Sequence, residues 1–317
     1  MNNSIYNPFT SFDFKYKKCF LSGEATDSNI QVIPTWLLEM AGFTGDEAIK
    51  MLDEGIHSYK SLKIPVNTAL VGKAIDVLDA EVEEAFKLGY EGVSKLNQDI
   101  LFKWLGKFLY GFVYIEMYNG IKQNVLSADG LNMGQGLMHK FGNLHAMLQG
   151  IYRSVTLENF KPYSIEVLEL KEPVSFSFKD EINTLTFSLK FKNFGIIACL
   201  QDNGVNSKYH STLLSHINKQ PLLEQQFEEL CARFYYSAYL FNRLPEYSIM
   251  ELNGEVFIEA MPLKGMLNKP IFDEWQHKTY GQVLENFWKP WGHLLLEINQ
   301  NPNAPMSYFS PSYLPEH

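Results

Sequence analysis

The spacing of hydrophobic residues predicts a helical first part of the chain. Between residues 66 and 88, apolar side chains recur largely at steps of three and four, which is typical of an amphipathic helix. Residues 99–118 are apolar almost all round the helix, so this second helix should be central. Helical spacing continues across 137–153. A short helix is expected to start at Pro34, and 44–47 is a candidate start for another.

After Pro162 the hydrophobic pattern changes from the spacing of a helix to a period of two residues, which is typical of a strand. Residues 163–170 and 185–191 alternate apolar and polar side chains, and 195–200 is a short apolar run. These segments are predicted strands, and Asp202-Asn203-Gly204 is a predicted turn. The middle of the chain should therefore form a small antiparallel sheet.

The clearest helical pattern of the whole chain covers residues 221–243. One stripe of it is apolar, and the charged residues are expected to lie largely off that stripe. They are Glu224, Glu228, Glu229 and Arg233. A further strand is predicted at 255–260 and a helical stretch at 281–296. The proline-containing tail from Asn301 is expected to be a loosely ordered arm.

These patterns predict an α+β fold with two regions. Residues 1–120 form a region of turns, short strands and helices, and residues 121–317 form a region with the antiparallel strands (about 163–200 and 255–260) and the long helix (221–243). No flexible linker marks the boundary between these two regions.

Composition and charge narrow the possible functions. The 36 acidic and 27 basic residues give a net charge of −9, which argues against strong non-specific binding to nucleic acid. Three scattered cysteines form no disulfide framework, which favours a reducing compartment, and we expect a cytoplasmic protein. The N-terminus does not resemble a signal peptide. The most apolar stretch, 101–117, is too short and too charged to span a membrane.

One pair of motifs carries more specific information. Cys19-Phe20-Leu21-Ser22-Gly23 precedes Gln31-Val32-Ile33-Pro34-Thr35-Trp36-Leu37-Leu38. This order resembles the opening of an HNH-type (treble-clef, ββα-metal) endonuclease domain, in which a Cys-x-x-Cys-Gly knuckle precedes Glu-His-Ile-Ile-Pro-Lys-Trp-Leu. The resemblance continues through Pro65 and the helix after it, where the family has a second Cys-x-x-Cys-Asn knuckle. It covers the first 120 residues and implies an uncharacterised bacterial relative of these nucleases.

The sequence departs from the family pattern at the zinc-ligand positions and at the position of the catalytic histidine, which is the general base. Cys19 stands at the first knuckle position, but Ser22 occupies the second. Val66 or Asn67, together with Leu70, stands where the second pair of cysteines belongs. A structural zinc needs about four thiolate or imidazole ligands. The position of the family's catalytic histidine falls on Gln31, and a glutamine cannot act as a general base.

The resemblance therefore implies a degenerate treble clef without zinc and without nuclease activity. We expect apolar side chains to fill the volume that the metal has left, among them Val66, Leu70 and Val71. The expected role is that of a non-catalytic binding or structural protein (a pseudo-nuclease), with no bound metal or cofactor. The sequence does not identify its partner, and a protein partner is compatible with it.

Two other functions stay open at this point. The chain could be a metal-dependent nuclease or phosphoesterase that uses non-standard groups, for example Asp79 with His57. It could also be a small-ligand or protein-binding module built on the strands of the middle region. The histidine pairs His139/His145 and His210/His216 match no metal-binding motif, so we interpret them as surface or hydrogen-bonded core residues.

Overall fold

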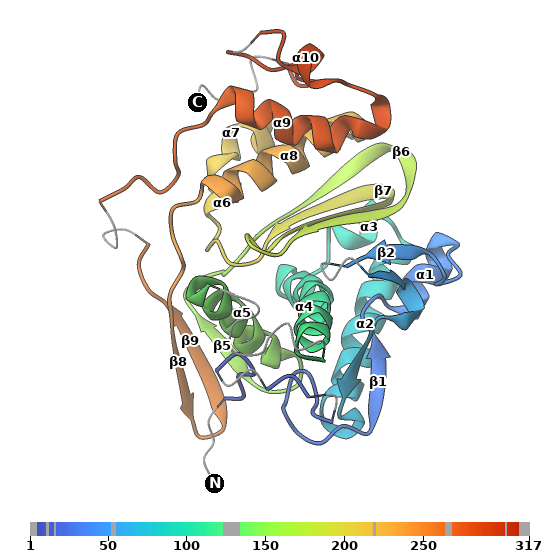
Figure 1. Cartoon of the computed structure of the whole chain (residues 1–317), viewed down its shortest axis with the longest axis vertical. Coiled ribbons are helices and arrows are strands. Elements are labelled where there is room, and N and C mark those ends of the chain that lie inside the picture. The colour runs from blue at the N-terminus through green and yellow to red at the C-terminus, as the bar shows by residue number, and fades with distance from the viewer. Residues whose placement is uncertain are drawn as a thin grey trace. The chain divides into compact units, whose positions relative to one another are not determined.

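The computed structural model describes residues 5–10, 13–15, 17–51, 55–122, 134–217, 220–263, 268–301 and 303–310 (Figure 1). It combines helices with small, mostly antiparallel sheets, which confirms the predicted α+β class. The chain divides into two compact units. The first consists of Met1–Lys87, Leu96–Phe160 and Glu246–Ala260, and the second of Leu88–Lys95, Lys161–Pro245 and Met261–His317. The first unit thus extends beyond residue 120.

The first unit begins with two antiparallel strands that lie far apart in the sequence. β1 (Ser28–Gln31) pairs with β4 (Lys63–Val66), with Asn29 opposite Pro65. The chain between them forms α1 (Thr35–Ala41), the hairpin of β2 (Ala48–Lys50) and β3 (Ile56–Ser58), and the short helix η1 (Tyr59–Ser61). α1 follows Pro34 as predicted, and Gly42 ends it in a left-handed conformation.

The prediction that a helix begins at 44–47 is wrong. Thr44 to Glu47 form a turn, because the Glu47 carboxylate accepts hydrogen bonds from the backbone N–H groups of Thr44 and Gly45 at 3.0 and 2.8 Å. Such local side-chain bonds compete with helix formation.

Three helices form the interior of the first unit. η2 (Thr68–Gly72) continues into α2 (Lys73–Lys87), and α4 (Gln98–Lys122) lies between α2 and α5 (Gln135–Leu148), which η3 (Gln149–Ile151) extends (Figure 1). These helices confirm the helical spacing. α4 is buried on nearly all sides. Gly111 permits a close approach there, since a Cβ atom at this position would lie 2.8 Å from a methyl carbon of Val32.

A three-stranded sheet completes the first unit. β9 (Glu255–Ala260) lies in its centre, parallel to β5 (Val155–Glu158) and antiparallel to β8 (Tyr247–Leu252). The sequence predicted β9 as a strand.

The second unit is built on one long hairpin. β6 (Ser164–Glu181) pairs antiparallel with β7 (Thr186–Cys199), which confirms the predicted antiparallel strands. The two segments predicted at 185–191 and 195–200 belong to the single strand β7. Register shifts occur between Glu169 and Ser177 of β6, and such irregularities let a long strand bend.

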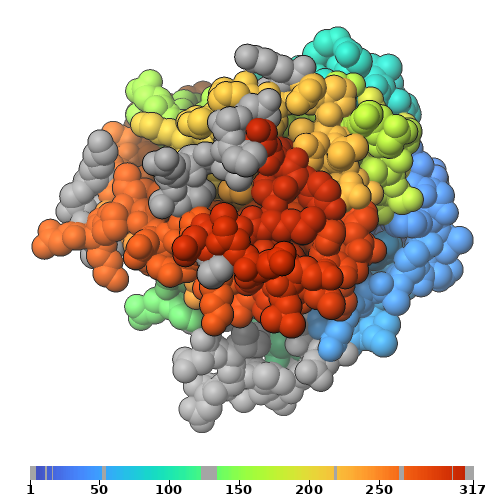
Figure 2. Space-filling view, turned by 90° about the horizontal axis from the view of Figure 1, so that it is seen from above, coloured from blue at the N-terminus to red at the C-terminus, as the bar shows by residue number. Residues whose placement is uncertain are grey.

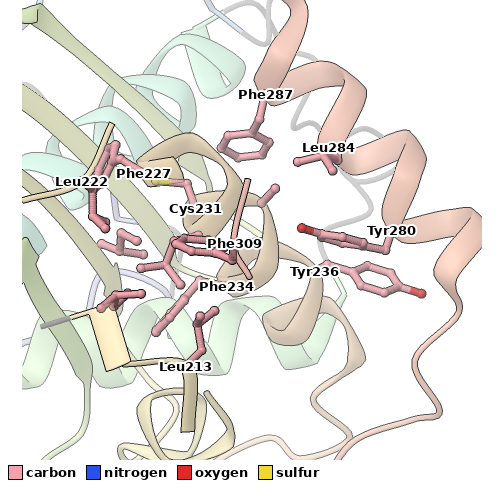
Figure 3. Packing of buried hydrophobic residues seen from close by; sticks show 14 of the residues in the cluster. Leu213, Leu222, Phe227, Cys231, Phe234, Tyr236, Tyr280, Leu284, Phe287 and Phe309 are labelled. Carbon is pink, nitrogen blue, oxygen red and sulfur yellow. The ribbon is translucent and has the colours of Figure 1, made fainter. Parts of the chain in front are cut away.

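Three helices pack directly on this hairpin: α3 (Tyr90–Val93), α6 (Val205–Tyr209) and α8 (Glu224–Leu240). α7 (Ser211–Ile217) packs on α6, and α9 (His277–Trp288) packs on α8. η4 (Lys289–Trp291) and α10 (Leu295–Ile298) pack on α9. Figure 3 shows Phe227, Cys231 and Phe234 of α8 in one buried cluster with residues of α9, among them Tyr280 and Leu284. Figure 2, a view from above, shows the red C-terminal residues beside the gold residues of α6 to α8.

Two findings in the second unit go beyond the sequence pattern or contradict it. Glu228, Glu229 and Arg233 of α8, which were expected to lie off the apolar stripe, are buried. The arm after Asn301 is not loose in the part that the structure describes, because the Glu229 carboxylate accepts hydrogen bonds from Ser307 Oγ at 2.6 Å and Tyr308 N at 2.7 Å. The prolines at 302, 311 and 315 lie outside the described residues.

The described helices include none that is both long and apolar enough to cross a lipid bilayer. α4 is the longest of them, with 25 residues, and it is interrupted by charged side chains such as Lys103 and Lys107.

Candidate functional site

The first knuckle position is a tight turn around Cys19. Cys19 N donates to Glu24 O at 2.7 Å, and Gly23 N donates back to Cys19 O at 3.0 Å. Gly23 has a φ of 73°, and a Cβ atom there would lie 2.5 Å from the ring of Tyr6, so the turn requires glycine. Cys19 is buried and Ser22 is partly exposed.

This turn lies directly against the second knuckle position. Phe20 N donates to Pro65 O at 2.9 Å, which joins the turn to the end of β4. The Asp27 carboxylate accepts two hydrogen bonds from Thr68, from N and Oγ1, both at 2.8 Å, and these bonds lower the pKa of Asp27. The structure therefore brings together the two segments that the resemblance aligned with the zinc knuckles.

The Asn67 side chain bridges these two segments. Its Oδ1 accepts from Leu70 N at 2.9 Å, which caps the helix that starts at Thr68. Its Nδ2 donates to Ala25 O at 2.8 Å, on the first turn. One amide thus connects the two turns. In the family that the sequence resembles, a metal ion makes this connection.

The apolar side chains that were expected to fill this volume differ in their burial. Val66 and Val71 are buried, together with Phe20 and Val32. Leu70 is 44% exposed, so its proposed share in the filling is wrong. The polar contact with the first turn is made by Asn67 instead. Within the described residues, no three His, Cys, Asp or Glu side chains gather into a possible metal site.

Gln31, at the position of the family's base, is the last residue of β1. Its Oε1 accepts a hydrogen bond from Thr35 Oγ1 at 2.7 Å, in the first turn of α1. The side chain thus ties the end of the strand to the start of the helix. A glutamine in this place can orient a neighbouring group but does not take up a proton near neutral pH.

The two groups of the alternative nuclease site lie on separate elements. Asp79 is on α2, where its Oδ1 accepts from Trp104 Nε1 at 2.9 Å and from Lys107 Nζ at 2.5 Å. His57 is in β3, opposite Ile49. The Lys107 ammonium already neutralises the Asp79 carboxylate, and a divalent cation at this carboxylate would compete with it.

His145 is a polar residue behind the first turn whose place the sequence did not indicate. It is fully buried, and its Nε2 lies 3.2 Å from the carbonyl oxygen of Phe20. A carbonyl only accepts, so Nε2 carries the proton, and Nδ1 accepts from Gln149 Nε2 at 3.4 Å. Burial lowers the pKa of His145 to about 4. His145 is therefore a neutral hydrogen-bonded core residue, as the interpretation of the histidines expected.

A second polar cluster lies inside the second unit. The side chain of His210 contacts Ser237 Oγ through Nε2 at 2.9 Å, and Ser237 Oγ donates to Asn206 Oδ1 at 2.6 Å. Asn206 Nδ2 in turn donates to Asp202 Oδ2 at 3.0 Å. The Ser237 hydroxyl has two oxygen acceptors besides His210, Asn206 Oδ1 and Phe234 O at 3.1 Å, which compete with the ring for its proton. Despite its Ser-His-Asp composition, this buried chain is not arranged as a nucleophile.

The charged residues of α8 are paired within the second unit. Glu228 forms ion pairs with Lys179 and Lys190 of the hairpin, and Glu229 with Arg233 one helical turn away. Burial raises the pKa of Glu229, which the nearby Arg233 partly opposes. These carboxylates therefore stabilise the packing of α8 and are not open to a bound cation.

A small cavity opens on the second unit between β6 and the segment before α8. About 110 Å³ is open to the centres of water molecules, enough for several of them. Its lining includes Tyr90, Leu168, Glu169, Gln220 and Leu222.

In the comparisons with known proteins, no family model, no curated protein and no solved structure matches this chain.

Proposed function

We propose that the chain is a non-catalytic protein with an HNH-like frame, a pseudo-nuclease that acts by binding or as a structural element in the bacterial cytoplasm. The observation that carries this proposal is the Asn67 amide, which connects the turn of Cys19 with the start of the helix at Thr68. In the family that the sequence resembles, zinc makes this connection.

The order of elements around Asn67 supports the proposal. β1 pairs antiparallel with β4, and β4 leads into the helix formed by η2 and α2, so two paired strands precede a helix, with α1, β2, β3 and η1 lying between the strands in the sequence. Gln31 ends the first strand, where the family has its general base. A histidine there activates water in the family, whereas the Gln31 amide is bonded to Thr35.

The burial of apolar side chains can stabilise this region without a metal ion. Structural zinc contributes about 10–16 kcal/mol of apparent binding energy in small domains. Burial of one large apolar side chain contributes about 1.5–3 kcal/mol. Phe20, Val32, Val66 and Val71 are all buried here, and together with the Asn67 bridge they replace much of what the metal supplies.

Two measurements on the purified full chain test the proposal. Elemental analysis should find much less than one zinc per chain, and supercoiled plasmid should stay intact with Mg²⁺ or Mn²⁺. Stoichiometric zinc would overturn the metal-free frame. Nicking that persists in Gln31→Ala but disappears in Asp79→Asn would establish the alternative nuclease, with His57→Ala as the companion variant.

The cavity of the second unit favours one other function, the binding of a small polar ligand. Tyr90, Glu169 and Gln220 would supply its polar contacts. A ligand that binds only the folded state raises the melting temperature, and the stabilisation grows with the logarithm of its concentration over Kd. A screen of small polar metabolites should then give a shift that Gln220→Ala reduces and the surface variant Glu81→Ala leaves unchanged.

A further inference from the structure

The three-stranded sheet of the first unit has an edge strand whose outward backbone N–H and C=O groups are not paired with another described strand. β8 is the edge strand in the order β5-β9-β8, and the two-residue turn Asn253-Gly254 joins it to β9 (Figure 1). Both turn residues have positive φ, 53° and 84°, as in a type I′ hairpin. In this hairpin Leu252 and Glu255 form the closing hydrogen-bonded pair, so the N–H and C=O groups of Ile249 and Glu251 point away from β9.

The outward groups of this edge have no backbone partner in the described part of the chain. The described backbone hydrogen bonds outside regular pairing include none from Ile249 or Glu251. On the opposite side of β9, Val256 N donates to Ser154 O at 3.1 Å, as the alternation requires. β8 thus presents the kind of free edge to which an extended peptide can add as a further strand.

The face of the sheet next to this edge carries exposed apolar side chains. Met250 is 65% exposed and Leu252 61% exposed, and both point to the same side because they are two residues apart. Phe257 lies opposite Met250 on β9 and is partly exposed. These three side chains form an apolar strip on a face that is otherwise polar.

Three carboxylates surround the strip. Glu255 lies opposite Leu252, and Glu259 lies opposite both Ser248 on β8 and Glu158 on β5. All three glutamates are exposed, and none of them has an ion pair or side-chain hydrogen bond to another described residue. Like charges directly opposite on neighbouring strands destabilise a sheet. The pair Glu158 and Glu259 therefore lowers the stability of the free protein, and a bound cation would relieve this repulsion.

We propose that the β8 edge and this face, defined by Met250, Leu252, Phe257, Glu158, Glu255 and Glu259, bind an extended basic segment of another protein. The segment adds to β8 through its backbone. Its aliphatic side chains cover the apolar strip, and its lysine or arginine side chains pair with the three glutamates. A second copy of this chain fits less well, because an isologous contact brings the same carboxylates of both copies together.

A peptide titration tests this surface with the full chain. The probe is a fluorescein-labelled, C-amidated nine-residue peptide of alternating lysine and valine, and the comparison is the same peptide with glutamate in place of lysine. Fluorescence anisotropy at low salt should show binding of the lysine peptide and not of the glutamate peptide. The double variant Glu255→Lys/Glu259→Lys should weaken binding by about tenfold or more. The control Glu39→Lys/Glu81→Lys has the same net charge and should bind within about twofold of the wild type.

The edge is tested separately from the charges. Ile249→Pro removes an N–H that points away from β9 and exchanges a half-buried side chain for another apolar one, so the hairpin should persist while binding is lost. Circular dichroism of this variant verifies that it is folded, and Met250→Ser gives a second test of the same surface if it is not. The proposal fails if the lysine peptide does not bind at about 1 mM, or if it binds the control and the Glu255/Glu259 variant equally. A dimer in solution that Met250→Asp dissociates would also overturn it, by assigning this face to a second copy.

Discussion

The ammonium of Lys107 lies 2.5 Å from the carboxylate of Asp79, on the neighbouring helices α4 and α2. Only 4% of the Lys107 side chain and 19% of the Asp79 side chain are exposed. Trp104 Nε1 donates to the same carboxylate oxygen. One carboxylate therefore satisfies two buried donors of α4, and this arrangement leads to a first prediction.

Asp79→Ala should lower the free energy of unfolding by about 3–5 kcal/mol, because it leaves a buried ammonium without its partner. Equilibrium unfolding in urea measures this loss. The double variant Asp79→Leu/Lys107→Met should recover much of it, since no charge is then buried unpaired. A loss below about 1 kcal/mol for Asp79→Ala would mean that water solvates Lys107 and that the pair is not structural.

Asn67→Ala removes both the cap of the helix at Thr68 and the bond to Ala25. We expect a loss of about 1–3 kcal/mol in the free energy of unfolding. Asn67→Asp keeps the acceptor for Leu70 N but lacks the donor to Ala25 O, so its loss should be smaller. Hydrogen exchange of residues 19–25 should accelerate in both variants. Unchanged exchange there would contradict the role of Asn67 as a bridge between the two turns.

His145 should make stability depend on pH. Its pKa is about 4 in the folded chain, below the usual 6.5, because burial disfavours the charged ring. Between these values the unfolded chain binds more protons than the folded chain, so stability falls as the pH falls from about 6.5 to 4. The His145 contribution lost by pH 4 is about 3 kcal/mol.

The measurement for His145 is a set of urea unfolding curves at several pH values. Buried carboxyl groups with raised pKa, such as Glu166 and Asp202, act in the opposite direction, so the comparison is made with His145→Gln. The variant should be less stable at pH 7 but lose less stability on acidification. Parallel pH profiles of variant and wild type would contradict the assignment.

Ser307→Ala should loosen the segment around Tyr308. Ser307 Oγ is bonded to the buried carboxylate of Glu229, and a hydrogen bond to a charged group contributes about 1.5–3 kcal/mol. We expect faster hydrogen exchange at residues 303–310 without a change in β6 and β7. Ser215→Ala, at an exposed hydroxyl that bonds within its own helix, is the matched control.

The sequence by itself determined the elements with a clear period. The even apolar distribution at 99–118 predicted the central helix α4, and alternation predicted β6 and β7. These predictions succeeded because the side chains of one element report which of its faces is buried. The proline at position 34 likewise indicated where α1 begins.

Only the tertiary structure decided which polar groups are buried and what satisfies them. Glu228 and Glu229 have the spacing of a solvated helix face, yet Lys190 and Ser307, distant in the sequence, complete their bonds. In the same way Asn67 gains its role from Ala25, which lies 42 residues earlier. A periodic pattern records the average polarity of one segment, whereas the burial of a charge depends on partners that the fold brings from elsewhere.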